Sequence, residues 1–232
     1  MSGKVRRAGA LLWVLLLLCA GALTLAACFD GTNKYRKNVS EIRENIYVGE
    51  SEHFEVVIYV GERENPYAMD GTVGEMNRFF LVIASPKFNL PLGEKVKAEV
   101  SAGGKKYVKE LISHPFNGSH AADLGGANAG SDNVMVNLRA MEFDEDVTAV
   151  SLLTENMLTS DEAYRKGAEL LKDSIENTLE DGKYHCEIQV KLIDKTKVDG
   201  KLFWHVSVYG KSGEMYAVLL EADKTAAPND ES

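Results

Sequence analysis

The chain has 232 residues, with 35 acidic residues against 26 lysines and arginines, so its net charge is −9 at pH 7. This acidic excess argues against a nucleic-acid partner and against a body that lies flat on anionic lipid, because both surfaces attract basic proteins. Only Cys186 lies beyond residue 28, so the body of the protein depends on a packed core and not on an internal disulfide.

Residues 1–27 have the three parts of a secretory signal peptide. A basic head at residues 4–7 precedes an apolar run over residues 11–18, and small residues follow up to Cys28. An alternative reading is an uncleaved transmembrane helix over residues 8–27, which carry no charge. Both readings put the body of the protein outside the cytoplasm.

The quartet Leu25-Ala26-Ala27-Cys28 resembles the lipobox of bacterial lipoproteins. The resemblance implies cleavage between Ala27 and Cys28 and attachment of lipid to the Cys28 thiol. One acyl chain holds a membrane weakly, so the mature cysteine is expected to carry more than one, such as palmitate. We therefore expect a lipoprotein anchored to the extracytoplasmic face of the cell membrane. The sequence leaves open whether the host is Gram-positive or Gram-negative.

Removal of residues 1–27 takes away three basic residues and no acidic ones, so the mature chain has a net charge of −12. Its first segment, residues 28–45, is polar and charged and is expected to be a lipidated tether. A boundary near residues 155–159 then divides the remainder into two predicted domains.

Residues 46–155 are predicted to form a β-sandwich of immunoglobulin-like size. Apolar and polar residues alternate along several segments, turn residues separate them, and no segment has the period of a helix. The segment lacks the cysteines and tryptophan of true immunoglobulin domains. The clearest predicted strands cover residues 54–60, 79–84, 96–100, 107–112, 134–138 and 147–153.

Two loops of this domain could be functional. In residues 61–71, Arg63, Tyr67 and Asp70 could form a small polar recognition site, although turn chemistry alone also explains the loop. This segment resembles one found in uncharacterised surface lipoproteins of Gram-positive bacteria, a resemblance that implies no activity. The second loop, residues 118–133, is rich in glycine and is expected to be a mobile surface loop.

Neither histidines nor acids give a convincing metal site. His114, His120 and Asp123 match no ligand spacing of a known kind, and a fourth ligand is missing. The acids at residues 144–146 lack the spaced oxygen ligands of a calcium loop. We predict no metal and no cofactor.

Residues 159–225 are predicted to form a small α+β module, a helix followed by a three-stranded antiparallel meander. Thr159 and Glu162 have the spacing of a capping box. An apolar stripe then runs along the helix, and Asp181-Gly182 is expected to end it. The stripe contains Tyr164, Ala168, Leu171, Ile175 and Leu179. Residues 183–194, 201–209 and 214–221 are the predicted strands, and residues 226–232 a disordered tail.

The alternation along these strands separates their faces. Cys186 falls in an apolar row with Ile188 and is expected to be a core residue, not a nucleophile. Trp204 falls in the matching row, under the helix, while the row from His185 to Lys191 and the pair His205 and Ser207 are expected to face solvent.

The segments 204–208 and 213–219 resemble the PepSY type of module, with matches at Trp204, Gly213 and Tyr216, although Lys224 and Thr225 stand where a closing glycine is expected. The resemblance implies an envelope module that binds or restrains a partner, often a peptidase, and it supplies no catalytic residue.

Two functions from different classes follow. The first is a lipid-anchored binding or protein-interaction module of the cell envelope, whose partner is another envelope protein, a wall-associated molecule or a solute. The second is a surface hydrolase or metal-dependent enzyme. The sequence contains none of the common motifs of a serine hydrolase, a zinc protease or a phosphate-binding loop, so we predict no enzymatic activity.

Overall fold

The computed structural model describes residues 31–68, 70–115, 117–129 and 133–225. The chain divides into two units, Met1–Lys37 and Asn38–Ser232. A short 3-10 helix, η1 (Asn33–Asn38), begins in the first unit. The signal peptide, Ala27, Cys28 and the tail at 226–232 lie outside the described residues. In the described part of the chain, the helices are too short or too polar to pass through a membrane.

The second unit is mostly β, as predicted. The segments with alternating residues form strands that turn one side inward: Phe54, Val56, Ile58 and Val60 are buried, and the residues between them are less so. The first eight strands are β1 (Val39–Glu50), β2 (Phe54–Glu64), β3 (Met76–Pro86), β4 (Val96–Ala102), β5 (Lys105–Ser113), β6 (His120–Asp123), β7 (Asn133–Ala140) and β8 (Phe143–Ser151).

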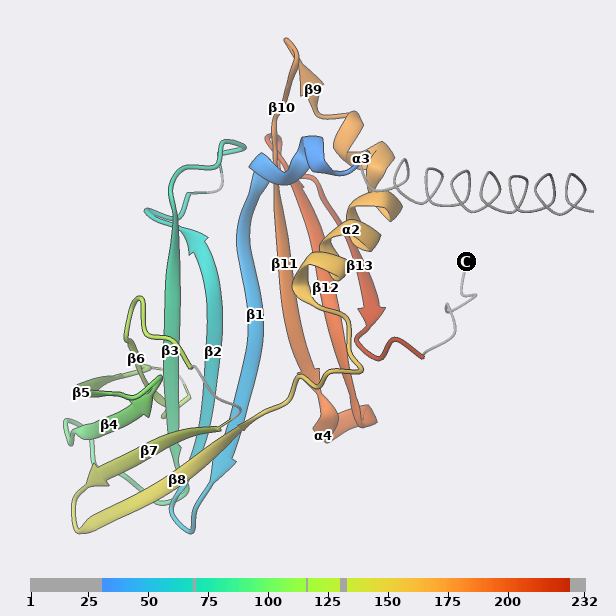
Figure 1. The fold of residues 1–232 in the computed structure, drawn as a ribbon. Helices are drawn as coiled ribbons and strands as arrows, with labels where there is room; N and C mark the ends of the chain where they lie inside the picture. The colour runs from blue at the N-terminus through green and yellow to red at the C-terminus, as the bar shows by residue number, and fades with distance from the viewer. Residues whose placement is uncertain (1–30, 69, 116, 130–132, 226–232) are drawn as a thin grey trace, which may run out of the picture. The chain divides into compact units, whose positions relative to one another are not determined.

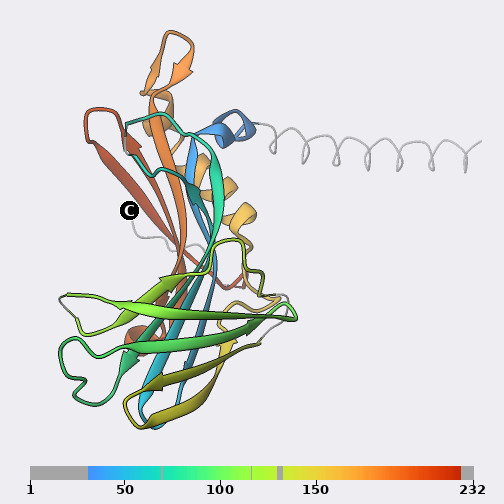
Figure 2. The same ribbon diagram turned by 90° about the vertical axis from the view of Figure 1, so that its left-hand side faces the viewer.

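These eight strands form a closed antiparallel barrel and not a sandwich. They pair in the order β1-β2-β3-β6-β5-β4-β7-β8, and β8 returns to β1 through the pairs Tyr47↔Ser151 and Val48↔Val150. Figure 2 shows the green and olive strands running across the long blue and teal ones. The predicted sandwich is therefore wrong, because a sandwich has two sheets with free edges. Apolar side chains from β2, β3, β4, β7 and β8 form one core inside the barrel.

Strand β6 lies in the segment 118–133, which we expected to be a mobile loop. It is only four residues long, but it pairs with β3 on one side and with β5 on the other. The sequence pattern did not predict this strand, because the residues around it are rich in glycine. Without it the barrel would be open between β3 and β5.

Three further strands extend the sheet beyond β1: β11 (Cys186–Lys195), β12 (Lys201–Gly210) and β13 (Met215–Glu221). They form the predicted antiparallel meander, and β11 attaches to β1 in parallel, with Val39 opposite Ile188. β1 thus begins inside the segment 28–45 that we expected to be a tether. Figure 1 shows β1 between the barrel strands and β11.

One edge of β1 pairs with two different strands along its length. Residues 39–43 pair with β11, and Tyr47 and Val48 pair with β8. Asn45 marks the change: its side-chain amide N–H donates to the Ser151 hydroxyl (2.9 Å), and its side-chain oxygen Oδ1 accepts the N–H of Ile46 (2.8 Å). The β1–β2 register also shifts here, and Gly61 fits because a Cβ at this position would overlap the Ile42 carbonyl.

The predicted helix begins as expected and ends earlier. Thr159 caps α2 (Ser160–Leu170): its hydroxyl accepts the Glu162 N–H (3.2 Å), and Glu162 accepts the Thr159 N–H (2.8 Å). A break at Leu171 separates α3 (Lys172–Glu176). Asp181 and Gly182 do not end the helix; they form the turn between β9 (Leu179–Glu180) and β10 (Lys183–Tyr184), where both have positive φ. A short helix, α4 (Thr196–Asp199), connects β11 to β12.

Helix α2 packs on β12, with β11 and β13 on either side (Figure 1). Trp204 is fully buried beneath it, as predicted, and its indole N–H donates to the Leu158 carbonyl (2.9 Å). The helix lies so close that a Cβ on Gly167 would come within 2.5 Å of the Val206 side chain. Cys186 is also in the core, as predicted, and burial raises the pKa of its thiol, so it is not an activated nucleophile.

Candidate functional site

The three residues proposed as a recognition site in the loop 61–71 do not converge. Arg63 pairs with Asp123 (3.1 Å) and lies over the Phe79 ring. The Asp70 carboxylate accepts the N–H of Thr72, two residues along the chain (2.9 Å). Tyr67 is the one that reaches across to another part of the sheet, where its hydroxyl accepts a hydrogen bond from the Gln189 amide (2.5 Å).

His114, His120 and Asp123 do not meet either. His120 is buried on β6, whereas Asp123, three residues later, lies on the other face of the strand. The Asp123 carboxylate accepts the N–H groups of Phe80 (3.0 Å) and Gly125 (2.9 Å) in addition to pairing with Arg63. Its role is to hold β6 and the following turn in place.

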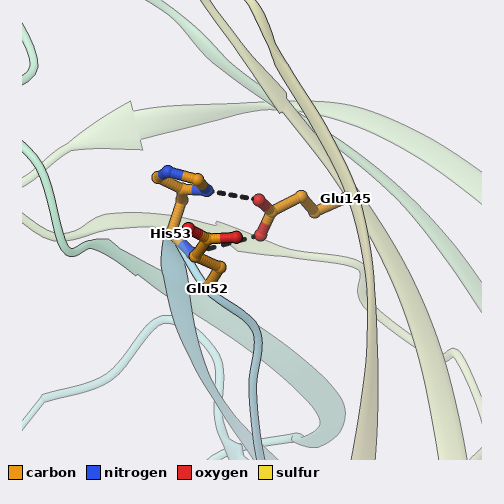
Figure 3. Close-up of side chains that lie close together, drawn as sticks. All are labelled: Glu52, His53 and Glu145. Atoms are coloured by element: carbon orange, nitrogen blue, oxygen red, sulfur yellow. Dashed lines mark hydrogen bonds and ion pairs between the residues drawn. The ribbon is translucent and has the colours of Figure 1, made fainter.

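A group of chemically active side chains lies where β1 turns into β2, and of its members the sequence analysis considered only Glu145, among the acids at 144–146. Glu52 and His53 of this turn and Glu145 of β8 place their ligand atoms within 4.8 Å of one another (Figure 3). It is the one such group of three among the described residues. Because 92 residues separate His53 from Glu145, no sequence spacing could reveal it.

The contacts of this group give it a structural role. Glu145 accepts both the backbone N–H of His53 (3.2 Å) and a hydrogen bond from its ring nitrogen Nδ1 (Figure 3). The nearby Ser51 hydroxyl and His53 hold the pKa of the Glu145 carboxyl below its ordinary value. The His53 ring stacks on Phe143, with 4.0 Å between ring centroids. The pair therefore ties the turn to β8, and the third member, Glu52, is exposed to solvent.

A second polar group covers the face of β11 and β12 that is opposite α2. Cross-strand neighbours share a face, so two rows form across three strands. The first row is Glu41, Gln189 and Ser207, and the second is Arg43, Lys191 and His205. We call these six residues, together with Glu187, the polar face.

The sequence prediction that this face is exposed is wrong for Glu187, Gln189 and Ser207, which are at most 2% exposed. The connection between β2 and β3 accounts for the burial of the first two, because Gly71 donates its N–H to Glu187 (3.1 Å) and Tyr67 contacts Gln189. Charges on this face are also paired: Lys191 lies 2.9 Å from Glu41. Alternation along one strand cannot reveal a cover that comes from a connection more than 100 residues away.

Two titratable side chains at the polar face have shifted pKa values: Tyr67, which covers the face, and His205, which belongs to it. Burial raises the pKa of Tyr67, and the nearby carboxylates of Glu41 and Glu187 raise it further, which outweighs the opposite effect of the Gln189 hydrogen bond. Burial, followed by the positive charge of Lys191, lowers the pKa of His205. Among the residues that the structure describes, the Ser207 hydroxyl has no hydrogen-bond partner. The described residues of this face therefore include no serine activated by a hydrogen-bonded base.

The open edge of the sheet is at β13. β1 and β8 close the barrel, so within the described residues β13 is the strand of this sheet with a neighbour on one side only. Met215, Tyr216 and Leu219 of this strand are each about half exposed. At its start, a groove of about 380 Å³ is lined by the end of α3, the β9 strand, His185, Lys211, Glu214 and Tyr216.

Comparison with known proteins adds no relative. No family model, curated protein or solved structure matches the chain. The functional argument therefore rests on the residues themselves.

The open edge at β13 differs from the group at His53 and from the polar face. The group at His53 and the polar face are satisfied largely from within the chain, by hydrogen bonds and ion pairs. The strand β13 instead presents apolar side chains, and one side of its backbone has no partner strand in the described part of the chain. The sequence identified the strand itself but could not show that it lies at an edge.

Proposed function

We propose that this protein is a lipid-anchored extracytoplasmic interaction module of the cell envelope, and that it contacts its partner through β13. The quartet ending in Cys28 supports the anchor, and the weak PepSY resemblance of residues 159–225 agrees with a partner-binding role. The observation that carries the interaction is the open edge at β13, with Met215, Tyr216 and Leu219 half exposed. Exposed apolar groups on an unpaired edge are a liability unless something covers them.

The barrel supports a surface role and not an internal one. The described side chains of its interior are almost all apolar, including Phe54, Phe80 and Leu138, and His120 of β6, opposite Ala84, is a polar exception. A protein partner on the outside fits this arrangement. The acidic mature chain favours a basic partner and discourages contact with anionic lipid headgroups.

The anchor and the interaction are tested separately. Cys28→Ala should abolish incorporation of radiolabelled lipid and leave the precursor uncut, since the thiol accepts the acyl group before cleavage. Equal incorporation of lipid in the wild type and in Cys28→Ala would refute the lipid anchor at Cys28.

The interaction is tested with a photo-crosslinking residue at Met215 of the protein in its native membrane. Met135 of β7 provides the control, because it is 43% exposed and is paired on both sides, with Ser101 of β4 and Thr148 of β8. Adducts with a defined protein are expected from position 215 and not from position 135. Adducts of equal yield at both positions, or none at either, would contradict an interaction through β13.

A further inference from the structure

The hydrogen bonds of β13 show which of its backbone groups point outward. The Ala222 N–H donates to the Leu202 carbonyl (2.9 Å) and the Gly210 N–H to the Glu214 carbonyl (2.8 Å), so even-numbered residues face β12. The β12–β13 register is continuous between these two bonds. In an antiparallel ladder the residues alternate, so Met215, Ala217, Leu219 and Glu221 direct their N–H and C=O groups away from the sheet.

We propose that this edge binds an extended segment of a partner protein as an additional antiparallel strand. The strand presents four outward N–H groups and four carbonyl groups in register, none of them from proline. An added strand gains affinity from these main-chain bonds and specificity from alternate side chains. The proposal rests on the interaction role given to β13 above and adds the class of partner and the mode of binding.

The side chains of β13 favour small or β-branched residues on both faces of the partner. Tyr216, Val218 and Leu220 lie on the side of α2, since they are opposite Val208, Val206 and Trp204. Met215 and Leu219 lie on the other side and are half exposed. Directly opposite side chains on neighbouring strands stabilise each other, so small or β-branched residues of the partner would cover this surface.

The charges at the start of β13 add a basic residue to the partner. Glu214 lines the groove together with Glu180, whose carboxylate is 3.7 Å from Lys211. Two carboxylates thus face one lysine and His185 in this groove. The segment that pairs with β13 is therefore expected to carry a lysine or arginine at the end that lies beside Glu214.

The same charges disfavour a second copy of this chain as the occupant. Antiparallel pairing of two β13 strands about Val218 would place Glu214 of one copy opposite Ala222 of the other, between its Glu221 and Asp223. Like charges on neighbouring strands destabilise their pairing. The net charge of −12 on each mature chain adds to the repulsion.

The experiment is hydrogen exchange, followed residue by residue by NMR, on the full-length chain in nanodiscs. The probe is an acetylated and amidated heptapeptide, Lys-Val-Thr-Val-Thr-Val-Lys, and the control peptide has glutamate in place of both lysines. In the protein alone, the amides of Met215, Ala217, Leu219 and Glu221 should exchange fast and those of Tyr216, Val218 and Leu220 slowly. The basic peptide should protect the first group at least tenfold, and the acidic peptide should not.

Variants distinguish strand addition from loose contact. Ala217→Pro removes one outward N–H and should weaken binding of the basic peptide about threefold to tenfold, whereas Ala217→Val keeps the N–H and should not. Should Ala217→Pro not fold, Glu214→Lys gives an independent test: it should weaken the basic peptide and strengthen the acidic one. Glu142→Lys, in an exposed turn of the barrel, makes the same change in net charge and should do neither.

Three results would overturn the proposal. The first is rapid exchange of the four outward amides at every concentration of the basic peptide. The second is protection in the protein alone that rises with its concentration, with a dimer in sedimentation, because a second copy would then be the occupant. The third is protection in the protein alone at all concentrations, because the chain would then cover its own edge. None of these readings depends on lipidation or on crosslinking in cells, so this proposal and the proposed function can fail separately.

Discussion

Replacement of Trp204 by alanine is the strongest test of how the α2 helix is held on the sheet. The side chain projects from β12, is fully buried under α2, and donates its indole N–H to the carbonyl of Leu158, a residue that is itself buried. Truncation of a buried tryptophan to alanine costs about 3 to 5 kcal/mol. Loss of the indole donor leaves the Leu158 carbonyl unpaired, which costs about 1 to 3 kcal/mol and overlaps with the first figure. A loss of about 5 kcal/mol is comparable to the whole stability of many domains.

The assay is urea unfolding of the full-length chain, followed by far-ultraviolet circular dichroism. Trp204→Phe separates the two contributions, because it keeps most of the apolar volume and removes only the donor; it should cost about 1 to 3 kcal/mol. Tyr216→Ala is the matched aromatic control on the neighbouring strand, where the side chain is 49% exposed, and should cost less than about 1 kcal/mol. If Trp204→Ala costs no more than Tyr216→Ala, the docking of α2 does not depend on this residue.

Three further predictions concern stability. Gly167→Ala should lower the free energy of unfolding by about 1 to 3 kcal/mol, because the added methyl group meets Val206. Gly126→Ala, which adds its methyl group in open space, should change the free energy of unfolding little. Equal effects of the two variants in urea unfolding would contradict the close packing of α2 on β12. Thr159→Ala should cost about 1 kcal/mol by removing the cap of α2, and Thr159→Ser should restore most of it in the same assay; no loss would show that the cap is dispensable. Burial lowers the pKa of His120 below its ordinary value of 6.5, so the unfolded chain takes up this proton more readily than the folded protein. The free energy of unfolding should therefore fall as the pH drops below about 6.5. His120→Gln should flatten the dependence of stability on pH below pH 7, and an unchanged slope would refute the assignment to His120.

The sequence predicted local structure better than long-range pairing. Alternation identified the buried side of β2, and the spacing of Thr159 and Glu162 identified the start of α2, because both patterns arise from neighbours along the chain. Alternation cannot distinguish a sandwich from a barrel, since the two have the same inward and outward positions. Closure depends on the two pairs between β1 and β8 and on the four residues of β6, which have no distinctive pattern.

The candidate sites were harder to predict for the same reason. Tyr67 was considered as part of a recognition site with Arg63 and Asp70, whereas in the structure it bonds to Gln189, a residue that was expected to face solvent. The His53–Glu145 pair joins two segments that are far apart in the sequence. The exposure of Met215 follows from the place of β13 at the end of the strand order, and that order is a property of the whole sheet.

The pairing of one edge of β1 with both β11 and β8 affects the order in which the strands assemble. β1 is the first strand to be synthesised, yet Val48 must wait for Val150 and Val39 for Ile188. Contacts between residues this far apart form slowly, because closing a long loop costs entropy before the contact stabilises anything. Local hairpins such as β7–β8 and β11–β12 are therefore expected to form early and the two seams along β1 last. Until then that edge of β1 has no partner, and a nascent or newly exported chain is most prone to aggregate through it.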